Sequence, residues 1–230
     1  MKRCVKNNWN TLAGAGVRIW HLAVGAALSY HHSIMSTTHL LYLHGFRSSP
    51  ASTKARLMAT AMASRYPDVT WLCPALAASP RQAMLEVLQA IDGWPKDSLA
   101  VMGSSLGGFY ATWLTERLGC KAVLLNPAVH PARDLAAYIG KNEQWHDPAE
   151  SFMFDPAFVD ELLALEIPII SHPERYLAII AKGDEVLDWR EISAHYPGAA
   201  IKLLPAGDHA LSDFEQHLDE IFDFLALAAR

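Results

Sequence analysis

The 230-residue sequence is poor in cysteine and has no excess of basic residues, and these two shortages exclude several classes of protein. Its three cysteines, Cys4, Cys73 and Cys120, are widely spaced, and none belongs to a CxxC pair of the kind found in structural zinc sites. Because an odd number cannot complete a disulfide framework, we expect a reducing, cytoplasmic location. Nineteen basic and 24 acidic residues give a net charge of −5, without the clustered basic excess of a nucleic-acid-binding protein. We therefore expect no nucleic-acid partner.

A long uninterrupted apolar run is also missing. A moderately apolar stretch at 12–30 contains Arg18 and His21, so we expect no membrane span there. The whole segment 1–34 lacks the patterning of the rest of the chain. We expect it to be a disordered N-terminal extension, with Met35 as the natural start of an α/β domain that covers 35–230.

Hydrophobic residues, in contrast, make up 51% of the chain and charged residues only 19%, which is enough for a sizeable core. From residue 38 onward, short apolar runs alternate with segments of helical spacing. We predict helices at 80–91, 106–118, 188–195 and 212–225, the last opened by a capping box, Ser212-Asp213-Phe214-Glu215. We predict strands at 40–43, 69–73, 99–102, 122–125, 176–181 and 199–204.

This alternation is typical of an α/β fold with a mostly parallel six-stranded sheet and helices on both faces. The region 130–173 contains no clean strand pattern and is rich in aromatic residues. We predict that it forms a small cap-like insertion over the sheet, with one helix near 156–165. Its aromatic side chains either line an apolar acyl pocket or pack in the core, and the sequence leaves both possibilities open.

A G-x-S-x-G motif, Gly103-Ser104-Ser105-Leu106-Gly107, follows a predicted strand and opens a predicted helix. A serine at such a sharp turn projects its hydroxyl above the sheet, which makes Ser105 the candidate nucleophile. Ser104 occupies the variable position before it. Because Leu106 begins the helix, its backbone N–H is a candidate donor to a developing oxyanion.

A serine hydroxyl needs a base to remove its proton, and that base needs a third group to orient it. His209 follows the last predicted strand, at the same sheet edge as Ser105, and is the candidate base. Asp184 follows the strand at 176–181 and is the candidate orienting carboxylate. The chain order Ser, Asp, His is that of α/β-hydrolases. Glu185 and Asp188 are rivals for the role of Asp184, and Asp208 is a weaker substitute.

The turn His44-Gly45-Phe46 closes the first strand, where the N–H of Phe46 is a candidate second oxyanion donor. We expect the side chain of His44 to brace this loop. Substrate contacts are predicted for His44, for Arg47, whose guanidinium suits a carboxylate or phosphate, and for Tyr110.

Several segments resemble the YqiA-type esterases, a bacterial α/β-hydrolase family. The resemblance covers nearly all of 38–227 and implies an esterase or thioesterase core without a metal or organic cofactor. Asn126-Pro127-Ala128 belongs to it, and we expect that segment to shape a turn rather than to carry chemistry. The other matching segments are Leu41-Tyr42-Leu43-His44-Gly45-Phe46-Arg47-Ser48-Ser49-Pro50, Lys54-Ala55, Gly103-Ser104-Ser105-Leu106-Gly107-Gly108-Phe109-Tyr110-Ala111, Gly183-Asp184-Glu185-Val186-Leu187-Asp188 and Gly207-Asp208-His209.

These observations predict a serine esterase that acts on a small-molecule carboxylic ester through an acyl-enzyme. Hydrolysis of thioesters such as acyl-CoA is the alternative, because it uses the same three residues. A non-catalytic binding module with the same fold is a third possibility. Three aligned reactive residues weigh against it.

Overall fold

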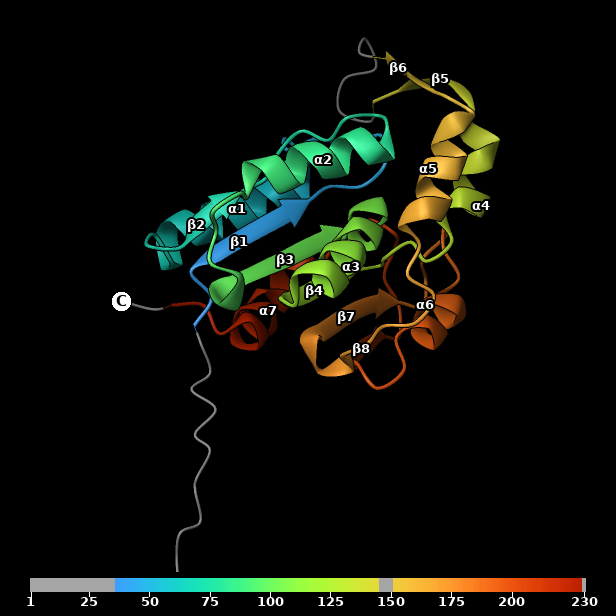
Figure 1. The fold of residues 1–230 in the computed structure, drawn as a ribbon. Helices are drawn as coiled ribbons and strands as arrows, with labels where there is room; N and C mark the ends of the chain where they lie inside the picture. The colour runs from blue at the N-terminus through green and yellow to red at the C-terminus, as the bar shows by residue number, and fades with distance from the viewer. Residues whose placement is uncertain (1–35, 145–150, 229–230) are drawn as a thin grey trace, which may run out of the picture. The chain divides into compact units, whose positions relative to one another are not determined.

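Six parallel strands form the central sheet in the computed structural model, which describes residues 36–144 and 151–228 (Figure 1). The predicted extension at 1–34 lies outside the described residues. The strands are β1 His39–Leu43, β2 Thr70–Leu72, β3 Leu99–Ser104, β4 Lys121–Leu125, β7 Tyr176–Ala181 and β8 Ala200–Leu204. Their order across the sheet is β2-β1-β3-β4-β7-β8, and all neighbouring pairs are parallel, which confirms the predicted mostly parallel sheet.

Helices cover both faces of this sheet (Figure 1). Successive side chains of a strand point to opposite faces, so the buried strands read as continuous apolar runs. The helices are α1 Thr53–Arg65, α2 Pro80–Ala90, α3 Leu106–Leu118, α6 Trp189–His195 and α7 Leu218–Leu225. Leu41 and Val101 pack under α2 and α3, whereas Leu40 and Met102 pack under α1 and α7. Within the described residues, no helix is both long and apolar enough to cross a membrane.

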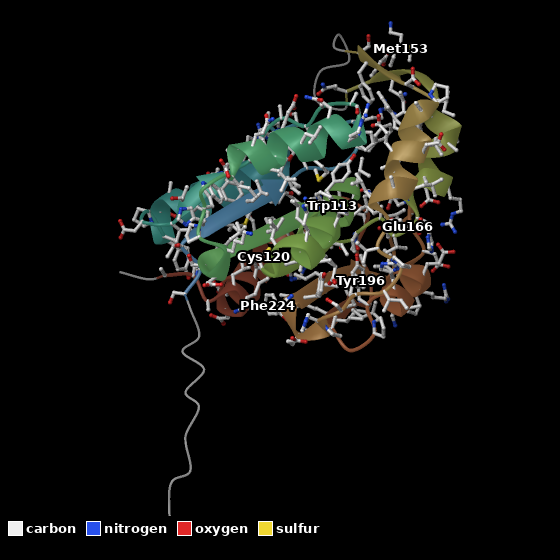
Figure 2. The ribbon with its side chains drawn as sticks, viewed as in Figure 1. Trp113, Cys120, Met153, Glu166, Tyr196 and Phe224 are labelled. Carbon is white, nitrogen blue, oxygen red and sulfur yellow. The ribbon has the colours of Figure 1, made fainter. Side chains whose placement is uncertain are left out.

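In the described part of the insertion after β4, two α-helices and a hairpin lie beyond the carboxyl ends of the strands (Figure 1). Helix α5, Ala157–Leu165, matches the predicted helix, and α4, Pro131–Leu135, precedes the hairpin. The expectation that this region holds no strand was wrong, because β5, Gly140–Glu143, pairs antiparallel with β6, Ser151–Phe154. The sequence of β5 is Gly-Lys-Asn-Glu, so backbone hydrogen bonds rather than an apolar pattern define it. Figure 2 shows Met153 at the outer side of this hairpin.

The C-terminal helix also departs from its prediction. The capping box at Ser212 does not form, because the backbone N–H and the hydroxyl of Ser212 both donate to the carboxylate of Asp208, at 2.9 and 2.6 Å. The chain then makes a 3₁₀ turn at Phe214–His217 before α7 begins at Leu218. These two hydrogen bonds join residues 208 and 212 within the loop that follows β8.

Asn126, directly after β4, ties together three segments at the carboxyl edge of the sheet. Its side chain is fully buried and its backbone is left-handed, with φ of 39°. The Oδ1 atom accepts a hydrogen bond from the backbone N–H of Ala181 at 2.8 Å. The Nδ2 atom donates to the carbonyls of Asp208 and His209, at 3.0 and 3.2 Å. One amide side chain therefore fixes the end of β7 relative to the loop after β8.

We expect Asn126→Ala to lower the free energy of unfolding by about 2–5 kcal/mol, because it leaves the N–H of Ala181 without an acceptor and the carbonyls of Asp208 and His209 without this donor. Urea unfolding checks this. Asn126→Gly keeps the left-handed backbone accessible and so separates lost hydrogen bonds from strain. Ser98→Ala is the matched control, since it removes a hydrogen bond to Thr38 of 2.8 Å at the opposite sheet edge. Equal losses in Asn126→Gly and Ser98→Ala would contradict the prediction.

Candidate active site

Ser105 lies at the sharp turn between β3 and α3 in a backbone conformation that non-glycine residues rarely adopt, with φ of 56° and ψ of −122°. Such strain persists only where the surroundings hold it. Here the N–H of Ser105 donates to the carbonyl of Leu125 at 3.0 Å, and its own carbonyl accepts from Gly108 and Ala128 at 2.8 and 3.0 Å. These bonds fix the hydroxyl above the carboxyl edge of the sheet.

A close backbone contact makes this turn possible. A Cβ atom built on Gly107 would lie 2.0 Å from the carbonyl oxygen of Leu43, so no larger residue fits without displacing α3 from β1. The second glycine of the G-x-S-x-G motif is therefore required by packing, in agreement with the reasoning from the sequence.

Ser105, His209 and Asp184 lie within hydrogen-bonding distance of one another in a single chain of contacts. The Nε2 atom of His209 is 3.0 Å from the Oγ atom of Ser105, and its Nδ1 atom is 2.8 Å from the Oδ2 atom of Asp184. Because a carboxylate can only accept, the Nδ1 atom carries the proton and the Nε2 atom is left to accept one from the serine. The three predicted residues thus meet in the arrangement that proton transfer from the serine requires.

The carboxylate of Asp184 has no exposed surface and is held by the backbone of its own loop. Its Oδ1 atom accepts from the N–H groups of Val186 and Leu187, at 2.8 and 2.9 Å. A Cβ atom on the preceding residue, Gly183, would lie 2.2 Å from the carbonyl oxygen of Gly207. The Asp184 loop and the His209 loop are therefore in backbone contact.

The three rival carboxylates make other contacts. Glu185 accepts from the backbone N–H of His209 at 3.0 Å rather than from its ring. Asp188 caps α6 by accepting from the N–H of Arg190 at 2.9 Å. Asp208 is paired with Ser212, as described above. Of these four carboxylates, only that of Asp184 lies within hydrogen-bonding distance of the imidazole ring.

Lys54, in the first turn of α1, is a site residue that the reasoning from the sequence missed. Its ammonium donates to the carbonyl of Ala210, directly after His209. Burial lowers the pKa of Lys54 to about 8, against the opposing attraction of Asp208 and Asp184. The ammonium therefore braces the His209 loop at Ala210, next to the carbonyls that Asn126 holds. Neither contact could be found from the sequence, because each joins residues more than 80 positions apart.

The loop after β1 lies against the serine. A Cβ atom on Gly45 would be 3.2 Å from the Cβ atom and 3.7 Å from the Oγ atom of Ser105. Phe46 is the next residue. Leu106 is the first residue of α3, and the N–H of a first helical residue has no acceptor within the helix. Among the described residues, neither the N–H of Phe46 nor that of Leu106 donates to a backbone carbonyl.

A cavity of about 720 Å³ opens beside these groups, and Ser105 and His209 both line it. Phe46, Leu106, Leu135, Tyr138 and Leu187 give one part of its wall an apolar character. Arg47, Ser48, Ser52, Thr53 and Lys54 supply a polar part. The cavity therefore suits a molecule with an apolar portion and a polar portion.

The three predicted substrate contacts differ in their placement. Arg47 lines the cavity. His44 is buried, with its Nδ1 atom 3.1 Å from the carbonyl of Gly45 and its Nε2 atom accepting from the N–H of Leu76 at 3.3 Å, so it braces the loop. The expectation for Tyr110 is corrected, because its side chain is 2% exposed and packs in the core beside Phe109. The motif places Tyr110 on α3 but does not reveal which face of the helix it occupies.

The aromatic residues of the insertion also differ in whether they line the cavity or pack in the core. Tyr138 lines the cavity, whereas Phe152, Phe154 and Phe158 pack against the hydrophobic core. Core packing is thus the main role of these side chains.

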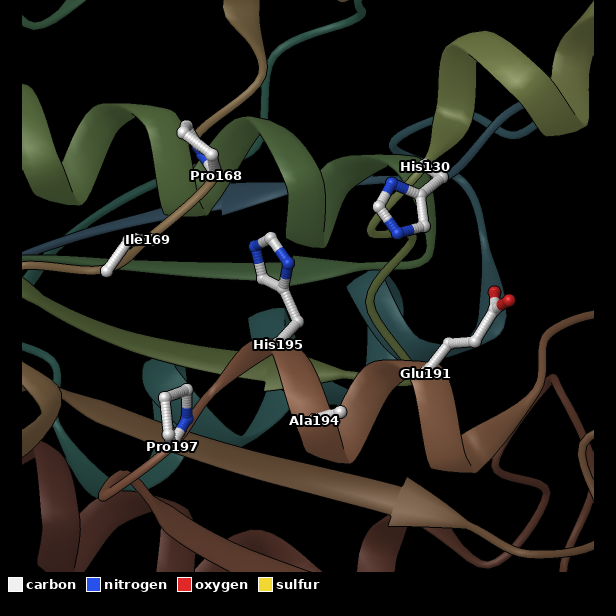
Figure 3. Close-up of a pocket in the computed structure, with 7 residues that line it drawn as sticks. All are labelled: His130, Pro168, Ile169, Glu191, Ala194, His195 and Pro197. Atoms are coloured by element: carbon white, nitrogen blue, oxygen red, sulfur yellow. The ribbon is translucent and has the colours of Figure 1, made fainter.

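A second cavity, of about 370 Å³, lies between His130 and His195 (Figure 3). His130 contacts Glu166 at 3.1 Å, and burial together with the charge of His130 lowers the pKa of His195. No serine or cysteine lines this cavity. Across residues 36–144 and 151–228, no group of three His, Cys, Asp or Glu side chains is placed to hold a metal ion.

Solved structures with similar folds are α/β-hydrolases and esterases. The mouse α/β-hydrolase domain-containing protein 10 is 14% identical, with a TM-score of 0.62 over 83% of this chain and 91% of that one. Est1E from Butyrivibrio proteoclasticus is 13% identical, with a TM-score of 0.58 over 85% and 88%. The chain therefore has the α/β-hydrolase fold, as its sequence predicted.

Two relatives in sequence are similar over nearly their whole length. A UPF0227 protein of Yersinia enterocolitica is 25% identical over 194 residues, which are 82% of this chain and 99% of the relative. A UPF0227 protein of Vibrio parahaemolyticus is 25% identical over 192 residues, 80% and 98% of the two chains. The model of the uncharacterised protein family UPF0227 matches residues 39–226. The chain is a member of the UPF0227 family.

Proposed function

We propose that this protein is a serine hydrolase that cleaves carboxylic esters. The observation that carries this proposal is the continuous chain of contacts from Ser105 Oγ through His209 to Asp184, at 3.0 and 2.8 Å, beside a cavity of about 720 Å³. The fold shared with Est1E from Butyrivibrio proteoclasticus and with the esterase Pf2001 from Pyrococcus furiosus supports it.

In the first half of the reaction, His209 Nε2 takes the proton of Ser105 as its Oγ atom attacks the carbonyl carbon of the ester. The carbonyl oxygen becomes an anion and accepts hydrogen bonds from the N–H groups of Phe46 and Leu106. The helix dipole of α3 also favours negative charge at this position. The tetrahedral intermediate then expels the alcohol, which takes its proton from His209 and leaves an acyl group on Ser105.

In the second half, water enters from the cavity and gives a proton to His209 as it attacks the acyl carbon. His209 returns that proton to Ser105 when the carboxylic acid leaves. Asp184 keeps the Nδ1–H tautomer and stabilises the imidazolium at both stages. Because His209 takes up one proton and releases it again in each half of the reaction, the cycle consumes only the ester and water.

The wall of the cavity sets the class of ester. Leu135 and Tyr138 from the insertion, together with Val186 and Leu187 from the Asp184 loop, offer apolar side chains, which suit an aliphatic or aromatic group of the substrate. Arg47 and Lys54, which also line the cavity, suit its polar portion.

A fluorophosphonate probe tests the nucleophile. We expect the folded protein to form a covalent adduct that peptide mass spectrometry places on Ser105 and not on Ser104, because only Ser105 contacts His209. Ser105→Ala should prevent labelling and ester hydrolysis. Heat-denatured protein is the control for nonspecific reaction. An unlabelled wild type, or a Ser105→Ala variant that labels equally, would show the proposal to be wrong.

Asp184→Asn tests the orienting carboxylate against its rival. We expect kcat for a p-nitrophenyl ester to fall roughly 10³–10⁴-fold, because an amide favours the wrong imidazole tautomer. Asp208→Asn should lower kcat less than about tenfold, since Asp208 bonds to Ser212 and only supports the loop. The assignment fails if the two variants lose similar activity.

The lowered pKa of Lys54 predicts that activity declines at alkaline pH. Below a pH of about 8 the ammonium is charged and braces the His209 loop beside Asp208 and Asp184. As the pH rises through that value the charge is lost, and the bond to Ala210 weakens by on the order of 1 kcal/mol, so kcat should fall about fivefold. The pH dependence of kcat for a neutral ester measures this.

Below a pH of about 8, Lys54→Met should already have the lower kcat that the wild type reaches at high pH. Its kcat should not decline further as the pH rises. Lys121→Met is the matched control, because Lys121 also donates from a part-buried ammonium to a backbone carbonyl, that of Phe224 at 2.9 Å, and so should retain the decline. A decline that survives in Lys54→Met would assign it to another group.

A further inference from the structure

The side chain of Phe46, which lines the cavity, also contacts three aromatic rings of the insertion. Its ring lies 5.4 Å from that of Tyr138, 5.7 Å from Phe152 and 5.6 Å from Phe154, measured between centroids. All three pairs are edge-to-face, with interplanar angles of 71°, 86° and 85°. This geometry is the favoured one for aromatic pairs. We call the three partner rings, Tyr138, Phe152 and Phe154, the aromatic socket.

The next residue is also held by the hairpin. Arg47 has a left-handed backbone, with φ of 57°, and its Nε atom donates to the carbonyl of Glu143 on β5 at 2.6 Å. Because a left-handed arginine is strained, an external contact is needed to keep it in place. Two successive residues of the loop after β1 are therefore anchored to one hairpin almost 100 positions away.

The hairpin is itself built to hold the socket. Phe152 and Phe154 are two residues apart on β6 and so share one face, opposite Asn142 and Gly140 in the register. The buried side chain of Asn142 donates to the carbonyls of Tyr138 and Gly140, at 2.7 and 3.1 Å. These bonds connect Tyr138, which precedes β5, to the strand pair that carries the other two rings.

From these contacts we infer that the insertion positions the oxyanion donor, and that Phe152 is a positioning residue for the N–H of Phe46. The inference rests on the proposed function, because it assigns that N–H to the oxyanion. The ring and the N–H belong to the same residue, Phe46. The contacts that fix the ring therefore also fix the direction of the N–H. Phe152 acts through Phe46, since it does not line the cavity. The insertion thereby sets the rate of the reaction as well as the shape of the pocket.

Phe152→Ala tests this, with Phe158→Ala as the matched control. Phe158 is part of the same aromatic cluster, but it contacts Phe154, at 5.5 Å, and not Phe46. With p-nitrophenyl acetate, whose acyl group is small, we expect Phe152→Ala to lower kcat about tenfold or more at a nearly unchanged KM, because a displaced oxyanion donor weakens transition-state binding. Phe152→Leu should recover part of this loss, and Phe158→Ala should keep most of the wild-type kcat.

A trifluoromethyl ketone provides a second readout. Ser105 adds to its carbonyl carbon while His209 takes the serine proton, which leaves an oxygen anion where the oxyanion forms. Its inhibition constant should rise in Phe152→Ala in parallel with the fall in kcat/KM. Thermal unfolding of the two alanine variants shows whether they lose similar stability. Equal kinetic effects in Phe152→Ala and Phe158→Ala would overturn the inference.

Amide hydrogen exchange separates failure of this inference from failure of the proposed function. Exchange at 44–48 should quicken in Phe152→Ala and not in Phe158→Ala, whether or not the wild type hydrolyses esters. Unchanged exchange in both variants would overturn the positioning role. A wild type that neither hydrolyses esters nor labels with the fluorophosphonate would instead overturn the proposed function.

Discussion

Close contact between backbones at the carboxyl edge of the sheet is the constraint on which the candidate site depends. Gly107 lets α3 approach the end of β1, and Gly183 lets the Asp184 loop touch the His209 loop. A Cβ atom added at either glycine would lie within 2.2 Å of a carbonyl oxygen. Without the first, the serine turn would lift away from the loop of Phe46, and without the second, the carboxylate would separate from the imidazole. Side-chain chemistry at this edge is therefore set by main-chain packing.

A buried carboxylate imposes the second requirement. Asp184 has no exposed surface, and a charge in that position is tolerated only when hydrogen bonds replace its lost water. Two backbone N–H groups and the ring of His209 supply them. The ammonium of Lys54 adds an opposite charge nearby. The hydrogen bonds from Asn126 and Lys54 to the His209 loop also stabilise this carboxylate, because they keep His209 where its ring can donate to it.

Most of the architecture could be predicted because it follows from local patterns. Short apolar runs gave the six strands, and parallel strands place the residues that follow them at one edge, which is why Ser105, Asp184 and His209 were expected to meet. The hairpin β5–β6 escaped because β5 has no apolar residue. The capping box failed because Asp208, only four residues away, competes for Ser212. The hydrogen bonds of Asn126 and Lys54 and the ring contacts of Phe46 could not be predicted, because they join segments that only the folded chain brings together.

The strain at Ser105 bears on whether the site is catalytic or merely retains its shape. A residue with a Cβ atom at φ of 56° costs stability that a glycine there would avoid. A binding module would gain from that replacement, since a turn alone needs no hydroxyl. The chain instead places a serine at the strained position, with its Oγ atom against an imidazole whose other nitrogen meets a buried carboxylate. Strain of this kind is expected where the side chain takes part in a reaction, and this is the physical reason that hydrolysis is favoured over binding.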